Sequence, residues 1–479
     1  MTDTRKQNYI NLAVFSTILV TIGIVQGMVY PYPFLFPDTG AYVLGGLSGQ
    51  YNGYRPMGYS AYLSCLHSLY PSLQFIYAVT YFLYAASTLC LLFSARRILQ
   101  IRSNTLFIAV GILSIISPRI IYSCNFLMSD ALFLILVNVL ITLILWTVEK
   151  KSWLTAIFQL PVLWCTCNVR YSGLFMIPVC VVSDIIALPG KRKLWKAAVC
   201  ILPVLLGLVF YSHVSQEAEE NTGVKCFSAF GGWQLINNAS VLMPEARKLE
   251  ISSFDDDEMK ALHAFLCGFP EETFNNEYTL STSYMWDNNL PYKQFLYSCL
   301  NANENSGYQN CWVLCGQLYG KYARKLILKF PFKYISRFVI PSFVSYFKFN
   351  PIEGHGLAFK NEDIYRIYYN VYDDFEYPDF DIYACTNPVR KVTDILYWIL
   401  SVACTVFFFA CFSRQKDRTP KMAALFIILF ILIFIMMQTM SSPNTTWRYT
   451  MPFYIPSLMF IMYCIDMFIR RLSSRATQA

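Results

Sequence analysis

The chain has 479 residues, of which 56% are hydrophobic and only 14% are charged. This composition lies outside the range of ordinary soluble globular domains and indicates an integral membrane protein. The formal net charge is +8, but the basic residues are dispersed as short clusters between apolar runs. A nucleic-acid partner, which calls for a continuous basic surface, is therefore disfavoured.

Ten apolar runs predict membrane-spanning helices, because about 20 apolar residues cross the hydrocarbon core of a bilayer. In chain order, these runs cover residues 10–29, 73–95, 105–122, 126–148, 153–167, 171–188, 195–213, 395–412, 422–440 and 449–469. The first run lacks a clear small-residue cleavage site, so it is interpreted as a retained anchor rather than a signal peptide. The fifth and sixth runs are separated only by Asn168, Val169 and Arg170, which must form a tight hairpin.

The loops between these runs differ sharply in charge. Eighteen Lys and Arg residues occupy alternate loops: Arg5, Lys6, Arg96, Arg97, Arg102, Lys150, Lys151, Lys191, Arg192, Lys193, Lys196, Arg414, Lys416, Arg418, Lys421, Arg470, Arg471 and Arg475. The intervening short loops hold four: Arg55, Arg119, Arg170 and Arg448. Because basic residues are retained in the cytoplasm, we predict an even number of spans with both termini cytoplasmic, in a plasma (inner) membrane.

Three parts of the chain follow from this topology. Residues 1–213 form an N-terminal transmembrane module of about seven helices, with a first outer loop at 30–72. Residues 214–392 are more polar and form a mixed, mainly helical extracytoplasmic domain. Residues 393–479 form a C-terminal transmembrane module of about three helices. The expected fold is therefore an all-α polytopic membrane protein with one outer domain.

The outer region contains several predicted elements of its own. Residues 255–268 read as a capped helix, and residues 308–330 as a helix that ends at Pro331. Residues 333–349 mix apolar, aromatic and basic side chains, which is typical of a helix at the headgroup level, although a spanning helix is an open alternative. The region holds six cysteines, an even number in a compartment that permits disulfides.

The first outer loop carries the clearest candidate for catalysis. Asp38 follows the first apolar run and is followed in turn by Arg55. A carboxylate can act as a general base, and an arginine at the same depth can bind phosphate. The structural alternative is that Asp38 only caps the helix that Thr39 begins, and for an isolated Asp this alternative is favoured.

A second acid, Asp130, lies at the outer end of the fourth run. A carboxylate in the first turn of a membrane helix usually faces a polar cavity. Its alternative role is a favourable interaction with the helix N-terminus. The four outer arginines lie beside helix ends, and their guanidinium groups match phosphate oxygens, although each one alone is better explained by snorkelling to lipid headgroups.

At these residues the sequence resembles the GT-C superfamily of membrane glycosyltransferases, which includes protein O-mannosyltransferases and aminoarabinose transferases of lipid A. The similar segments are PDTGAYV (37–43), YRPMGYSAYL (54–63), SPRIIYSCNFLMSDALFLIL (117–136), NVRYSGLFMIP (168–178), KLILKFPFKYISRF (325–338) and WRYTMPFYIP (447–456). The chain departs from that family at Asp130, where Glu is commoner, and at Tyr171, where Pro is usual.

The resemblance implies inverting transfer of a sugar from a polyprenyl-phosphate carrier to a glycan, lipid or protein acceptor on the extracytoplasmic side. Asp38 would be the general base, and Asp130 would assist by orienting Asp38 or by sharing a divalent metal ion with it. Arg55, Arg119, Arg170 and Arg448 would bind the donor phosphate, and Tyr42 and Tyr59 would contact the substrate.

Two other functions remain open at this point. An O-antigen-type polymerase or ligase also has many spans and a large outer loop, but it would carry its key Arg or His residues in that loop. A transporter or flippase for a lipid-linked sugar would show repeated halves and charges within its spans. The sequence has no visible repeat, and its clearest acid lies in the first outer loop.

Overall fold

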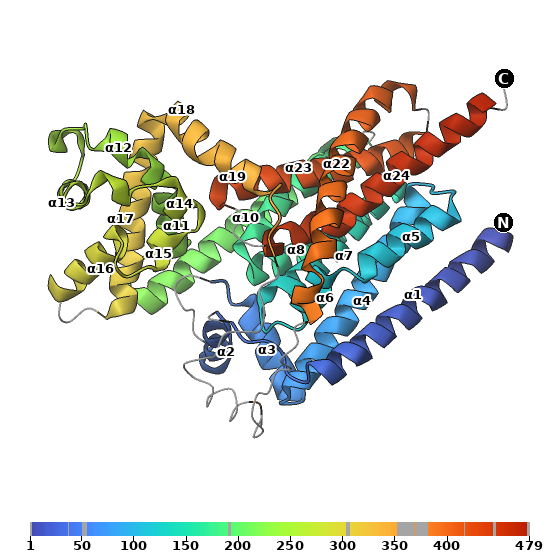
Figure 1. Cartoon of the computed structure of the whole chain (residues 1–479), viewed down its shortest axis with the longest axis horizontal. Coiled ribbons are helices and arrows are strands. Elements are labelled where there is room, and N and C mark those ends of the chain that lie inside the picture. The colour runs from blue at the N-terminus through green and yellow to red at the C-terminus, as the bar shows by residue number, and fades with distance from the viewer. Residues whose placement is uncertain are drawn as a thin grey trace.

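The computed structural model describes residues 2–36, 38–49, 55–189, 193–302, 307–351, 369, 382–415, 417–443 and 447–476. Within these residues every regular element is helical, and the β contact is an isolated parallel bridge between Phe34 and Phe126. The helices form a long bundle and a smaller group of short helices at one end of it (Figure 1). The all-α prediction is confirmed for this described part of the chain.

Among the described residues, seven helices are long and apolar enough to cross a membrane. They are α1 (Thr2–Val29), α4 (Leu73–Ile98), α7 (Ser129–Lys150), α10 (Lys193–Thr222), α22 (Asn387–Cys411), α23 (Arg418–Ser441) and α24 (Met451–Ala476). An eighth candidate is the pair α5 (Asn104–Ile115) and α6 (Pro118–Cys124), which is bent by 43°. The bend follows from Pro118, which disfavours helical backbone at the preceding Ser117, where ψ is 114°.

Two predicted spans form shorter apolar helices. They are α8 (Trp153–Val169) and α9 (Met176–Ala187), with the 3-10 turn η1 (Tyr171–Phe175) before α9. Arg170 lies between them with extended backbone, φ −151° and ψ 139°, at the predicted hairpin. All ten predicted runs are therefore helical, whereas ten membrane crossings remain a prediction.

Both chain termini lie at one end of the bundle, and the short helices of the polar region lie toward the opposite end (Figure 1). This arrangement agrees with an even number of crossings. Helix α10 continues past residue 213 to Thr222, and α22 begins at Asn387, before residue 393. The three-part division of the chain remains a prediction. The assignment of each end to a side of the membrane remains a prediction from charge.

The small domain comprises the helices between residues 229 and 345. In chain order, they are α11 (Ala229–Ala239), η2 (Ser240–Leu242), α12 (Met243–Ala246), η3 (Ile251–Ser253), α13 (Asp257–Cys267), η4 (Glu271–Thr273), α14 (Asn276–Leu280), α15 (Ser283–Trp286), α16 (Pro291–Ala302), α17 (Tyr308–Lys329), α18 (Pro331–Tyr334), η5 (Ile335–Val339) and α19 (Ile340–Ser345). Both helices predicted for this region, 255–268 and 308–330, are present. Asp256 caps α13, because its carboxylate accepts a hydrogen bond from the Met259 N–H at 2.7 Å.

The core of the small domain is the contact between α11 and α17. The rings of Trp233 and Trp312 stack with centroids 5.4 Å apart. Gly232 is required at this crossing, because a Cβ atom there would lie only 1.7 Å from the carbonyl oxygen of Gly316. The close approach lets the two helices bury their aromatic faces against each other, so this domain has a hydrophobic core of its own.

The segment predicted at 333–349 is helical from α18 through α19, with a π-helical turn at η5. Phe332, Ile340 and Phe343 are exposed on it. It is not among the helices long and apolar enough to span a membrane in the described residues, and its position at the headgroup level remains a prediction. The six cysteines of the outer region are free thiols in the structure.

Candidate active site

The first outer loop is held against the turn that precedes α7. The Phe34 N–H donates to the Asn125 carbonyl at 2.7 Å, and the Leu127 N–H donates to the Phe34 carbonyl at 3.0 Å. The hydroxyl of Thr39 adds a hydrogen bond to the Leu127 carbonyl at 3.1 Å. These contacts place the start of α2 (Thr39–Ser48) beside the start of α7, although the two segments are far apart in the chain.

Asp38 occupies the N-cap position of α2, but its side chain makes no capping hydrogen bond. Its carboxylate forms an ion pair with Arg55 instead, and 34% of the Asp38 side chain is exposed. The interpretation of Asp38 as a simple helix cap is therefore wrong. The Asp38 carboxylate is held by the guanidinium group of Arg55, and part of the Asp38 side chain remains exposed to solvent.

A chain of polar contacts connects Asp38 to the start of α7. Arg55 Nη1 donates to the hydroxyl of Tyr42 at 3.0 Å, and that hydroxyl lies 3.0 Å from the hydroxyl of Ser129. Ser129 directly precedes Asp130. The two predicted acids are thus linked through three intervening side chains, without direct contact.

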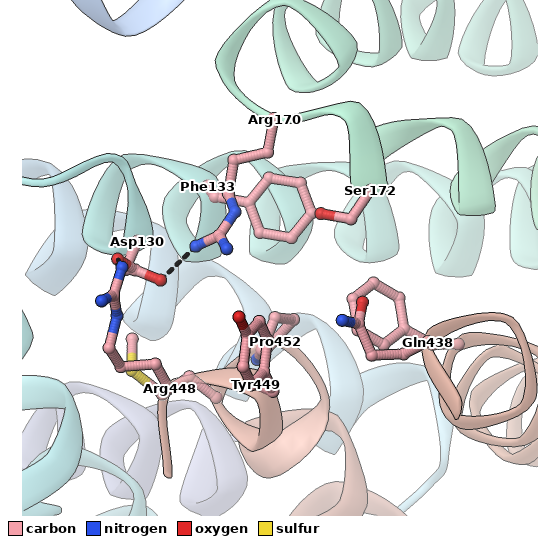
Figure 2. Close-up of a pocket in the computed structure, with 10 residues that line it drawn as sticks. Asp130, Phe133, Arg170, Ser172, Gln438, Arg448, Tyr449 and Pro452 are labelled. Carbon is pink, nitrogen blue, oxygen red and sulfur yellow. Dashed lines mark hydrogen bonds and ion pairs between the residues drawn. The ribbon is translucent and has the colours of Figure 1, made fainter. Parts of the chain in front are cut away.

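Asp130 is buried at the centre of a second cluster. One of its oxygens accepts a hydrogen bond from Arg170, and the other accepts two from Arg448, at 3.0 Å from Nε and 2.5 Å from Nη2. Figure 2 shows the two arginines approaching the carboxylate from different elements. Arg170 comes from the hairpin between α8 and η1, and Arg448 from η7 (Trp447–Thr450) before α24. Asp130 therefore holds two guanidinium groups close together.

Gly58 explains how the first outer loop reaches this hairpin. A Cβ atom at Gly58 would lie 2.5 Å from the carbonyl oxygen of Asn168, two residues before Arg170. Glycine at the start of α3 (Gly58–Leu69) thus allows that helix to approach the hairpin closely. The Arg-Pro-Met-Gly segment of the first loop and the Arg170 hairpin are packed together in this way.

A small pocket opens beside the Asp130 cluster. Its lining residues are Asp130, Phe133, Arg170, Ser172, Phe434, Gln438, Arg448, Tyr449, Met451 and Pro452 (Figure 2). The side chains of Arg170 and Arg448 remain 24% and 21% exposed, whereas that of Asp130 is 2% exposed. Two guanidinium groups and one carboxylate leave one positive charge at the pocket, which suits an anion with several oxygens. Asp38 does not line this pocket in the part of the chain that the structure describes.

Asp38 nevertheless belongs to the same region. It lies close enough to Arg448 for a favourable electrostatic interaction. Phe36, two residues before Asp38, has its ring 6.0 Å from the Arg448 guanidinium carbon. The structure therefore brings together Asp38, Arg55, Asp130, Arg170 and Arg448 as two neighbouring ion-pair clusters.

The predicted substrate contacts of Tyr42 and Tyr59 are not supported by their burial. Tyr42 is 4% exposed and Tyr59 is 2% exposed, and their rings meet edge to face at 4.8 Å. Burial raises the pKa of Tyr59 well above its ordinary value. Tyr59 is a packing residue, and Tyr42 acts as a link between Arg55 and Ser129.

Arg119 belongs to a separate cluster. It forms an ion pair with Asp394 of α22, and its Nη1 donates to the Thr450 hydroxyl at 3.1 Å. Both charged side chains are largely buried, at 9% and 13% exposure. The carboxylate of Asp394 offsets the positive charge of Arg119, which was predicted to bind donor phosphate. Asp394 was not among the predicted site residues, although an acid within the first turns of a membrane helix signals a buried partner.

Among the residues that the structure describes, the acids of this region do not form a metal site. Within the described ranges, no group of three or more His, Cys, Asp or Glu residues lies close enough to hold a metal ion. Both oxygens of Asp130 accept hydrogen bonds from guanidinium groups, and these two cations would repel a metal ion beside them. The residues present do not fit the divalent ion suggested for Asp38 and Asp130, so no chemical step is assigned to one.

Comparisons with known proteins gave two similar structures. No protein-family model and no curated protein matches the chain. The apo crystal structure of the oligosaccharyltransferase from Archaeoglobus fulgidus aligns with 98% of this chain and 52% of its own, at 10% identity and a TM-score of 0.48. The oligosaccharyltransferase AglB from Archaeoglobus fulgidus, in complex with an inhibitory peptide and a dolichol-phosphate, aligns with 97% of this chain and 51% of its own, at 10% identity and a TM-score of 0.45. The present chain spans about half the length of these structures.

Proposed function

We propose that this chain is a membrane glycosyltransferase of the GT-C type, which transfers a sugar from a polyprenyl-phosphate carrier to a glycan, lipid or protein acceptor on the extracytoplasmic side. The observation that carries the proposal is the convergence of Arg170 and Arg448 on buried Asp130, beside a pocket and next to the Asp38 loop. The sequence motifs that resemble the GT-C superfamily contain these same residues.

Arg170 and Arg448 are the donor phosphate-binding residues in this proposal. When the bond between the sugar and the phosphate breaks, negative charge grows on the phosphate oxygens. Guanidinium groups that are already held in place stabilise this charge without reorganisation. Asp130 is a positioning residue, because its two oxygens are occupied by the arginines that it orients.

Asp38 is the general base. An acceptor hydroxyl oxygen attacks the anomeric carbon of the sugar from the side opposite the phosphate, and the bond from that carbon to the phosphate oxygen breaks. The phosphate leaves with the electron pair, and the acceptor proton passes to the Asp38 carboxylate. Attack from the opposite side inverts the configuration of the sugar. Arg55 orients the carboxylate through their ion pair.

A glycosyltransferase differs from a flippase or transporter in the fate of the donor. A transferase cleaves the sugar from its carrier and releases polyprenyl phosphate, whereas a flippase moves the intact donor across the bilayer. The two outcomes are separated by extracting the lipid after the reaction and measuring how much free polyprenyl phosphate it contains.

The test uses the full-length protein reconstituted in phosphatidylcholine vesicles with a panel of radiolabelled polyprenyl-phosphate sugars and candidate acceptors. The wild type is expected to release polyprenyl phosphate from at least one donor, and Arg170→Gln and Arg448→Gln are expected to lose that release. Arg97→Gln is the matched control, because Arg97 pairs with Glu149 at the other end of α7. Cleavage that survives in Arg448→Gln, or intact donor moved across the bilayer without cleavage, would overturn the proposal.

A further inference from the structure

A second cavity lies at the end of α7 opposite Asp130. It has a volume of about 480 Å³. Its lining comes from the end of α7, the end of α9 and the loop after it, α10 and the start of α23. Four separate segments of the chain therefore meet around one space at this end of the bundle.

Three cations from different segments line this cavity: Lys151, Lys196 and Arg418. The structure pairs none of them with an acid in the part of the chain that it describes. Lys196 gives one hydrogen bond to the Leu188 carbonyl, at 3.0 Å, and keeps two further N–H groups. The cavity is thus strongly positive.

Other basic residues at the same end of the bundle form ion pairs with acids. Arg97 contacts Glu149 at 3.2 Å, and Arg470 contacts Asp466 at 2.8 Å. The general bias of basic residues toward the cytoplasm accounts for their presence at this end. This bias alone does not explain why three basic residues surround one cavity without an acid partner.

The rest of the lining is mostly apolar. Ile185, Leu188 and Met422 form part of its wall, and Ile185 is 49% exposed. The buried acid of α9, Asp184, lies one helical turn before Leu188 and does not line the cavity. A ligand at this place would therefore meet positive charge and hydrocarbon together.

We propose that this cavity binds the headgroup of an anionic phospholipid. The lipid phosphate would lie among Lys151, Lys196 and Arg418, and the upper part of an acyl chain would lie along the apolar wall. Basic pockets between membrane helices are suited to acidic headgroups, because each Lys or Arg attracts the phosphate and the adjoining helices contact the chain. The cavity is distinct from the Asp130 pocket, since the two lie at opposite ends of α7.

The experiment measures binding of phosphatidylglycerol to the full-length protein by native mass spectrometry and by titration in phosphatidylcholine nanodiscs. The test variant combines Lys151→Asn, Lys196→Gln and Arg418→Gln. Asparagine is chosen at position 151 because the backbone there is left-handed, with φ of 52°, and Asn tolerates this conformation. The control variant combines Arg5→Gln, Lys6→Gln and Arg102→Gln, which removes the same charge from exposed positions outside the cavity.

The expected result is retention of phosphatidylglycerol by the wild type and the control, and at least about tenfold weaker binding in the test variant. Lys151→Asn alone should weaken binding in the same direction, which covers the case in which the triple variant does not fold. Equal losses in the control would show a general charge effect and overturn the site. Binding of inorganic phosphate as tight as that of phosphatidylglycerol would overturn the lipid assignment and indicate a soluble phosphate ligand.

Discussion

Arg448 and Asp130 are separated by 318 positions in the chain, yet two N–H groups of Arg448 donate to the same oxygen of Asp130. Arg170 donates to the other oxygen. This arrangement ties together the start of α7, the hairpin after α8 and the turn before α24. The same residues give the pocket its positive charge, so the stability of the fold and the proposed phosphate binding depend on one cluster.

The two kinds of residue in this cluster should respond differently to substitution. Asp130→Asn leaves two guanidinium groups without their carboxylate, and should lower the free energy of unfolding by about 3 kcal/mol. Arg448→Gln leaves Asp130 paired with Arg170, and should lower stability less while weakening donor binding at least tenfold. Thermal unfolding in detergent and titration with polyprenyl phosphate measure the two effects. Equal losses of stability in the two variants would contradict this division of roles.

Asp38→Asn should strongly reduce sugar transfer, because an amide cannot take the proton of the acceptor hydroxyl. The expected loss of turnover is about a thousandfold, with donor binding retained. Asp255→Asn is the control, since Asp255 is also an acid in an exposed ion pair, with Lys325 at 2.8 Å. Full turnover in Asp38→Asn, measured as product formed from labelled donor, would remove the general-base assignment.

The hydrogen bond between Tyr42 and Ser129 should couple the first outer loop to α7. A double-mutant cycle with Tyr42→Phe and Ser129→Ala should give a coupling energy of about 1 kcal/mol in thermal stability, the usual contribution of one buried hydrogen bond. The cycle of Tyr42→Phe with Ser183→Ala is the control, because Ser183 of α9 donates its hydrogen bond to the Cys180 carbonyl. Additive effects in the first cycle would show that the two hydroxyls are energetically independent.

Arg119→Gln should affect folding more than donor binding. Its charge is offset by Asp394 in a largely buried pair, so its loss should lower the free energy of unfolding by about 3 kcal/mol. Affinity for polyprenyl phosphate should stay within about twofold of the wild type, because Arg119 does not line the Asp130 pocket. A large loss of affinity with unchanged stability would restore the sequence prediction that Arg119 binds donor phosphate.

His263 should make the stability of the small domain depend on pH. Its imidazole is buried between α13 and α17, with Nδ1 2.8 Å from the Tyr322 hydroxyl, and burial lowers its pKa. Below the unfolded-state pKa of about 6.5, the unfolded chain takes up a proton that the folded domain does not. Stability is therefore full above that pH and falls by up to about 1.4 kcal/mol per unit as the pH decreases below it.

The loss of stability in the small domain is measured by hydrogen exchange of the amides in α13 and α17, on the full-length protein between pH 7 and pH 5. His263→Gln should flatten the pH dependence, whereas His213→Gln, in α10 of the bundle, should leave it unchanged. A pH dependence that persists in His263→Gln would assign the effect to another group.

The sequence was sufficient to predict the long apolar helices. It did not predict where those helices are interrupted or which helices pack against one another. Every predicted span is helical, because an apolar run of that length has few other ways to satisfy its backbone hydrogen bonds in lipid. The run at 105–122 was predicted as one helix, although Pro118 within it was a visible signal for the bend between α5 and α6. In the first outer loop, α2 was considered only as the helix that Asp38 could cap, and α3 was not predicted from its short, mixed segment.

The candidate site was predicted in its residues and only partly in its geometry. Asp38 and Arg55 were expected side by side, as a base and a phosphate-binding group, but their ion pair with each other was not predicted. The contacts of Asp130 with Arg170 and Arg448 depend on how distant helices pack, which one sequence does not reveal. The same reason explains why the pairing of Arg119 with Asp394 was missed, and why the burial of Tyr59 was not foreseen.

The central claim is that Arg170 and Arg448 bind the phosphate of a lipid carrier. The most direct test is a cryo-electron microscopy structure of the full-length protein in lipid nanodiscs with a polyprenyl phosphate bound. We predict phosphate density in hydrogen-bonding contact with both guanidinium groups, in the pocket beside Asp130 and Tyr449. Phosphate bound elsewhere, with Arg170 and Arg448 contacting only Asp130, would contradict the account.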